Sequence, residues 1–69
     1  MSDINLVVWK NIKKFRNQLD YTQTDLSKKS NISRPTISQI ETWDKSPTIK
    51  TLELIANALK VDIKELFNN

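Results

Sequence analysis

Residues 22–41 read TQTDLSKKSNISRPTISQIE, and this stretch decides the fold. Its opening threonine is followed three residues later by an acid, which is a capping box that starts a helix. Asn31 tolerates the left-handed conformation that closes a helix, and Ser33 is a second N-cap. A proline lies in the following first turn, where its missing N–H does no harm. The stretch therefore predicts two short helices, 23–30 and 34–41, that meet at a sharp angle across about three residues.

Apolar residues at helical spacing lie on both sides of this stretch. Before it, an amphipathic helix over residues 4–19, capped by Ser2 or Asp3, is predicted from four apolar positions: Val8, Ile12, Phe15 and Leu19. Trp9 adjoins this stripe, and we expect it to pack partly against the last helix. After the stretch, Thr48 caps a helix that ends near residue 60, with an apolar face made by Leu52, Ile55, Ala56 and Leu59. Asp62 and Glu65 form another capping box for a short helix over residues 63–67, whose Leu66 and Phe67 either close the core or face a partner.

The composition narrows the fold class. The chain has no glycine, which suits helices and not β-hairpins, because tight hairpin turns need residues at positive φ. We therefore expect an all-α protein with one compact domain of five helices over residues 1–69, and a helix-turn-helix at about residues 22–41. The N-terminus does not open as a signal peptide, and no apolar run approaches the roughly 20 residues of a membrane span. We expect a soluble protein of the cytoplasm.

The composition also excludes several kinds of site. There is no cysteine and no histidine, so disulfides, thiolate nucleophiles and the commonest zinc ligand are absent. The acids lie mostly at helix caps, and no pair of nucleophile and base is evident. We therefore expect a binding protein that is not an enzyme and that holds no metal or cofactor.

Positive charge is concentrated in the middle of the chain. The net charge is +3, but residues 10–50 hold nine cationic side chains against four acidic ones. A cationic region suits nucleic acid as partner, because each Lys or Arg placed at a phosphate releases condensed counterions. Such a charge also serves solubility alone in many small proteins, so it leaves both readings open.

Several spaced motifs together resemble the lambda-repressor and Cro type of helix-turn-helix domain, the XRE family. The motifs are Thr22-Gln23-x-Asp25-Leu26-Ser27, Ser33-Arg34-x-x-Ile37-Ser38-x-Ile40-Glu41, Pro47-Thr48, Leu52-x-x-Ile55-Ala56-x-Ala58-Leu59-x-Val61 and Leu66-Phe67. Each is common by chance, whereas their order and spacing are specific. The resemblance implies a lambda-repressor-like fold in which the helix over residues 34–41 reads double-stranded DNA.

The resemblance implies base contacts from five positions: Arg34, Pro35, Thr36, Ser38 and Gln39. Their chemistry supports most of them, because an arginine forks onto guanine, a glutamine pairs with adenine, and a threonine methyl meets a thymine methyl. Arg34 has a phosphate contact as its alternative. Pro35 offers only an apolar contact, and Ser38 reaches a phosphate or nothing.

Phosphate contacts are expected around this reading helix. The resemblance places Gln23 on a phosphate, where it also orients the reading helix; the alternative is an ordinary exposed residue at a helix start. Further candidates lie at helix starts and in the loop after residue 41, where backbone N–H groups attract anions: Thr22, Ser33, Thr42, Lys45, Ser46, Thr48 and Lys50. The alternative for the loop is a plain solvated segment.

One expected pair supports the reading helix, and one residue departs from the family. Arg16 and Glu41 match a family pair in which a bidentate arginine and carboxylate hold the reading helix against the first helix. Asn31 replaces the usual turn glycine, which asparagine tolerates. Trp43 replaces a glycine after the reading helix and must avoid positive φ or accept strain. Three arrangements are open to the Trp43 side chain: packing on the next helix, insertion between subunits, or contact with sugar-phosphate. We favour packing on the next helix.

The sequence therefore indicates a transcriptional regulator that binds a specific, nearly palindromic site in double-stranded DNA as a homodimer. Relatives of this length include phage repressors, regulators of mobile elements and restriction-modification controller proteins, and the motifs are most similar to the controller proteins. The dimer contact is expected near Val61, Ile63, Leu66 and Phe67, although these residues also suit the core. The rival interpretation is a protein-interaction module, such as an antitoxin or anti-repressor, built on the same scaffold.

Overall fold

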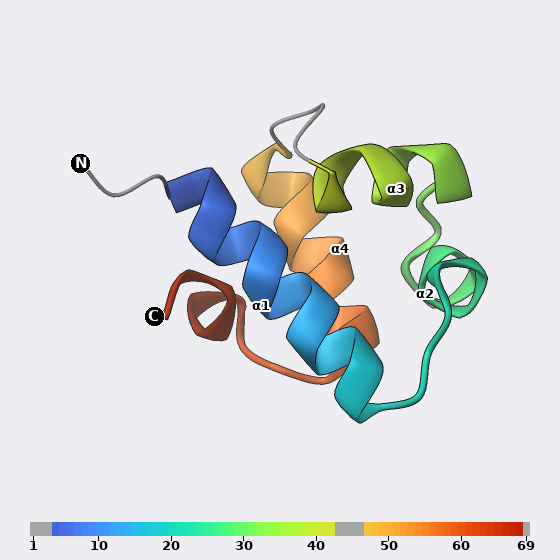
Figure 1. The fold of residues 1–69 in the computed structure, drawn as a ribbon, viewed down its shortest axis with the longest axis horizontal. Helices are drawn as coiled ribbons and strands as arrows, with labels where there is room; N and C mark the ends of the chain where they lie inside the picture. The colour runs from blue at the N-terminus through green and yellow to red at the C-terminus, as the bar shows by residue number, and fades with distance from the viewer. Residues whose placement is uncertain (1–3, 43–46, 69) are drawn as a thin grey trace.

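The computed structural model describes residues 4–42 and 47–68. In this part of the chain it has four α-helices and one 3-10 helix: α1 (Ile4–Gln18), α2 (Gln23–Ser30), α3 (Arg34–Glu41), α4 (Ile49–Leu59) and η1 (Ile63–Phe67). Figure 1 shows α1 crossing α4 at the centre of the molecule, α2 and α3 together on one side, and η1 against α1 on the other. The all-α class is confirmed.

The last element differs from the expected helix. It is a five-residue 3-10 helix, and its N-cap Asp62 makes no side-chain cap hydrogen bond, so the capping box predicted there is wrong. A segment this short forms too few hydrogen bonds to propagate an α-helix, so tertiary contacts decide its shape. The Asn11 side chain on α1 supplies such contacts, because its amide donates to the carbonyls of Leu66 (2.9 Å) and Asn68 (2.6 Å).

One apolar core joins all five elements. Its fully covered side chains come from each of them: Ile12, Leu26, Ile37, Ile55, Leu59 and Leu66. Leu66 is 0% exposed, so it closes the core. Leu19 was expected to be the last residue of the apolar face of the first helix. It is 36% exposed and lies outside that face, because α1 ends at Gln18.

Residues other than glycine make the left-handed turns. Asn31 has φ 61° and closes α2 as predicted, while Asp20 (φ 58°) follows α1 and Lys60 (φ 63°) closes α4. Thr48 caps α4 by accepting a hydrogen bond from the Thr51 backbone N–H at 3.2 Å. Of these turns, the one at Asn31 lies between α2 and α3 and leaves three residues to connect the two helices.

Candidate nucleic-acid interface

Helix α3, the expected reading helix, is anchored on one side and exposed on the other. Ile37 and Ile40 are 1% and 3% exposed and tie it to the core. Of the positions expected to face bases, Arg34, Pro35 and Gln39 are exposed. A fork of donors and an amide on an exposed face can pair with base edges in a major groove.

The other two expected base-reading residues, Thr36 and Ser38, are half-buried, and each takes part in a hydrogen bond at one end of α3. The Thr36 hydroxyl lies 2.7 Å from the hydroxyl of Ser33, which also accepts from the Thr36 backbone N–H at 3.4 Å as the N-cap of α3. The Ser38 carbonyl accepts from the Thr42 hydroxyl at 2.9 Å. Ser33, Thr36 and Thr42 therefore already use their hydroxyls to shape the two ends of α3.

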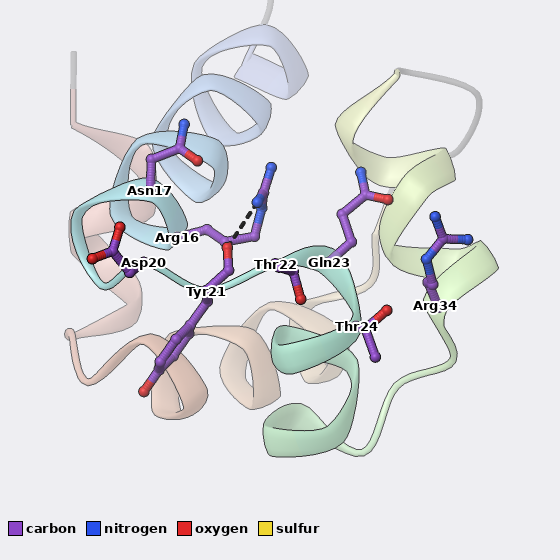
Figure 2. A pocket seen from close by; sticks show the side chains of 8 residues that line it. All are labelled: Arg16, Asn17, Asp20, Tyr21, Thr22, Gln23, Thr24 and Arg34. Carbon is purple, nitrogen blue, oxygen red and sulfur yellow. Dashed lines mark hydrogen bonds between the residues drawn. The ribbon is translucent and has the colours of Figure 1, made fainter.

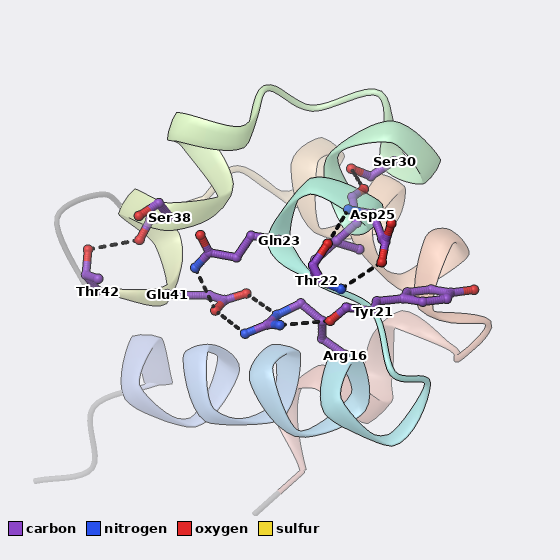
Figure 3. Close-up of polar contacts among 10 residues, drawn as sticks. Arg16, Tyr21, Thr22, Gln23, Asp25, Ser30, Ser38, Glu41 and Thr42 are labelled. Carbon is purple, nitrogen blue, oxygen red and sulfur yellow. Dashed lines mark hydrogen bonds and ion pairs between the residues drawn. The ribbon is translucent and has the colours of Figure 1, made fainter.

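A buried carboxylate fixes α3 against α1 and α2. Glu41 is 3% exposed, and its two oxygens accept from Arg16 Nε at 2.9 Å and Nη2 at 3.0 Å, which is the bidentate geometry expected for the pair. Gln23 Nε2 donates to the same carboxylate at 3.2 Å, as Figure 3 shows. The sequence suggested that Gln23 orients α3 but not that it does so through Glu41. Arg16 Nη1 also donates to the Tyr21 carbonyl at 2.8 Å and so holds the turn before α2.

A hollow of about 410 Å³ opens beside this pair, and its lining residues come from the end of α1, the turn that follows it, the start of α2 and the start of α3. They are Arg16, Asn17, Asp20, Tyr21, Thr22, Gln23, Thr24 and Arg34. In Figure 2 the side chains of Arg16, Gln23 and Arg34 extend towards the same side. The Arg16 charge is balanced by Glu41, and Asp20 adds a carboxylate to the lining, so Arg34 and the positive end of the α2 dipole are the groups here that suit an anion such as a phosphate. Asn17 and Thr24 had no motif of their own, and only the tertiary structure brings them to this hollow.

The start of α2 is closed by the predicted capping box. Asp25 N donates to the Thr22 hydroxyl at 3.0 Å, and the Thr22 backbone N–H donates to the Asp25 carboxylate at 2.9 Å. This backbone hydrogen bond, followed by the contact with the Thr22 hydroxyl, lowers the pKa of Asp25 below its usual range. The Thr22 hydroxyl therefore has a structural partner in addition to its expected role at phosphate.

The lowered pKa of Asp25 predicts a pH dependence. Because the folded pKa lies below the unfolded value of 3.8, the carboxylate stabilises the fold above that value, and this contribution is lost as pH falls through the folded pKa. Asp25→Asn should remove this part of the acid sensitivity in urea unfolding measured from pH 5 to pH 2. Glu53→Gln, which removes an exposed carboxyl on α4, is the control. An unchanged acid profile for Asp25→Asn would contradict the prediction.

The remaining phosphate candidates follow α3 in the chain, and the structure describes only some of them. Lys50 is exposed in the first turn of α4, next to the Thr48 cap. Trp43, Lys45 and Ser46 lie outside the described residues, as do Ser2 and Asp3, which were expected to cap α1. Within residues 4–42 and 47–68, no helix is long and apolar enough to cross a membrane, and no three metal-ligating side chains form a group.

The helix-turn-helix family model matches residues 12–66. The chain is 42% identical to the wild-type restriction-modification controller protein C.Esp1396I, with a TM-score of 0.88 over 97% of this chain and 87% of that one. It is 39% identical to the C.Esp1396I chain in a nucleoprotein complex, with a TM-score of 0.83 over all of both chains. It is also 33% identical over 61 residues to the immunity repressor protein of Bacillus phage phi105. That match covers 88% of this chain but only 42% of the repressor, so the chain spans less than half of that relative.

Proposed function

This chain belongs to the helix-turn-helix family of DNA-binding regulators, and we propose that it is a transcriptional controller that reads a specific duplex sequence through the open face of α3. The observation that carries the proposal is the position of Arg34. It is exposed at the start of α3 and also lines the hollow at the start of α2. Base edges and backbone phosphates can therefore be contacted from one surface.

The proposed site divides into two sets of residues. Arg34 and Gln39 read bases by hydrogen bonds. Pro35, Thr36 and Ser38 contact the DNA from the same helix through shorter side chains. Phosphates are bound by the starts of α2 and α3 and by the region after α3: Thr22, Gln23, Ser33, Thr42, Lys45, Ser46 and Lys50. Arg16 and Glu41 hold α3 at its angle.

We propose that the regulator acts in the bacterial cytoplasm as a homodimer, each subunit placing α3 in successive major grooves about 34 Å apart. The proposed dimer contact uses apolar residues near the end of the chain: Leu54, which is 38% exposed, and the half-buried Val61, Ile63 and Phe67. Leu66 is excluded from that contact because the core encloses it. The likeness to C.Esp1396I over most of both chains favours a restriction-modification controller above a phage repressor.

Selection of duplexes from a random library by the purified protein tests this function. We expect two inverted half-sites whose centres lie one helical turn apart, and an affinity that falls steeply with salt. Binding that ignores both salt and sequence would instead support a protein-interaction module on the same scaffold.

Variants at Arg34 and Lys50 separate base reading from phosphate binding. Arg34→Ala should relax the preference at one base position and cost about 1–3 kcal/mol on the selected duplex. Lys50→Ala should weaken selected and scrambled duplexes by the same factor, because phosphates carry no sequence information. Kd values for both duplexes, measured by fluorescence anisotropy, distinguish the two. A uniform loss in Arg34→Ala would move that residue to the phosphate set.

A further inference from the structure

Asp20 places a carboxylate in the hollow where the proposed function needs a phosphate. It is the acidic residue among those that line the hollow, and its side chain is exposed. Figure 2 shows Asp20 and Arg34 at opposite ends of the view, with the side chains of Arg16 and Gln23 between them. No ion pair joins Asp20 to a cation in the part of the chain that the structure describes. Its negative charge is therefore not cancelled by a neighbour.

The local structure gives no reason for a charge at residue 20. Asp20 has φ 58°, a conformation that glycine and asparagine take at the least cost, and Asn31 makes the equivalent turn at φ 61°. The Asp20 backbone N–H donates to the Asn17 carbonyl at 3.1 Å, so the residue follows directly on the last turn of α1. The C-terminal end of a helix dipole is negative and disfavours an acid. An asparagine would make this turn as well as the aspartate does.

The hollow is small enough for the Asp20 charge to act on an anion bound there. A volume of about 410 Å³ corresponds to a space about 9 Å across, which is close to the Debye length of about 8 Å in physiological salt. Salt therefore screens the interaction between Asp20 and a phosphate in this hollow only in part. Arg34 and the start of α2 attract such a phosphate, and Asp20 repels it.

We propose that the Asp20 carboxylate limits the affinity of this surface for duplex DNA by repelling the backbone phosphate that Arg34 and the start of α2 attract. This inference rests on the proposed function. Phosphates carry no sequence information, so the repulsion lowers the affinity for every duplex by the same factor. A genome offers a large excess of other sites, and a weaker uniform attraction leaves more of a cationic regulator free of them.

The test compares Asp20→Asn and Asp20→Lys with Glu53→Gln. Asparagine removes the charge and keeps the left-handed turn, and Lys60 at φ 63° shows that this fold accepts a lysine in that conformation. Glu53 is exposed on α4 and lines a separate hollow, so Glu53→Gln changes the net charge as much as Asp20→Asn does, but away from Arg34. Kd values for the library-selected duplex and a scrambled duplex are measured by fluorescence anisotropy at 0.05 M and 0.5 M salt.

The expected result is tighter binding that depends on charge and on salt. Two like unit charges about 7 Å apart in water repel by about RT, which is about a three-fold effect on affinity. At 0.05 M salt, Asp20→Asn should bind both duplexes about three-fold more tightly per subunit, and Asp20→Lys about nine-fold. At 0.5 M salt, screening should reduce the gain of Asp20→Asn below about 1.5-fold. Glu53→Gln should match the wild type, and Asp20→Asn should melt at no lower temperature than the wild type.

The outcomes separate this inference from the function on which it rests. Unchanged or weaker binding by Asp20→Asn would overturn the inference while leaving DNA binding intact. An equal gain in Glu53→Gln would assign the effect to net charge, and a full gain at 0.5 M salt would assign it to the shape of the turn; either result would also overturn the inference. Failure of the wild-type protein to bind any duplex in a salt-dependent way would overturn the proposed function itself.

Discussion

Replacing Glu41 with alanine is expected to lower the free energy of unfolding by about 3 kcal/mol. The substitution leaves the Arg16 guanidinium, whose side chain is only 12% exposed, without its carboxylate, and an uncompensated buried charge is costly. Gln23 loses its acceptor at the same time. Urea unfolding followed by circular dichroism measures the change. A loss below about 0.5 kcal/mol would mean that the pair behaves as solvated surface charges.

A double variant distinguishes the pairing from simple loss of packing. Arg16→Met with Glu41→Leu replaces both charges by apolar groups of similar size, and such exchanges are often close to neutral in stability. We expect it to recover most of the stability lost in Glu41→Ala. The DNA affinity of this double variant should be lower than that of the wild type, because the guanidinium beside the hollow is gone and α3 has lost its bidentate restraint.

Leu66→Ala is expected to destabilise the domain by about 3 kcal/mol, within the 2–5 kcal/mol range for truncating a buried leucine. Leu66 is 0% exposed although it lies in the terminal 3-10 helix, so the truncation leaves a cavity between η1 and the helices that pack on it. In a 69-residue domain this is a large fraction of the total stability. Thermal unfolding should show the loss as a marked fall in Tm.

Leu54→Ala provides the comparison for Leu66→Ala. Leu54 is the same residue type but is 38% exposed on α4, so its truncation should change monomer stability by less than about 1 kcal/mol. If Leu66→Ala cost as little stability as Leu54→Ala, Leu66 would not be a core residue.

Local sequence determined the helices and their starts. Thr22, Ser33 and Thr48 each accept a backbone hydrogen bond from the residue three positions on, and Asn31 takes the left-handed conformation. These features were predictable because each depends on groups a few residues apart, whose geometry the backbone itself sets. The Arg16–Glu41 pair was expected only from the family resemblance, since 25 residues separate its members.

The tertiary structure alone decided which long-range groups meet. The capping box expected at Asp62 did not form, and Asn11, 55 residues before Leu66, holds the terminal segment instead. The hollow likewise joins Asn17 and Arg34 from separate helices. The sequence by itself determined an all-α chain in which two short helices meet across a tight turn, because caps and apolar spacing are local. The position of α3 and the hollow beside it depend on packing between distant residues, which no local pattern records.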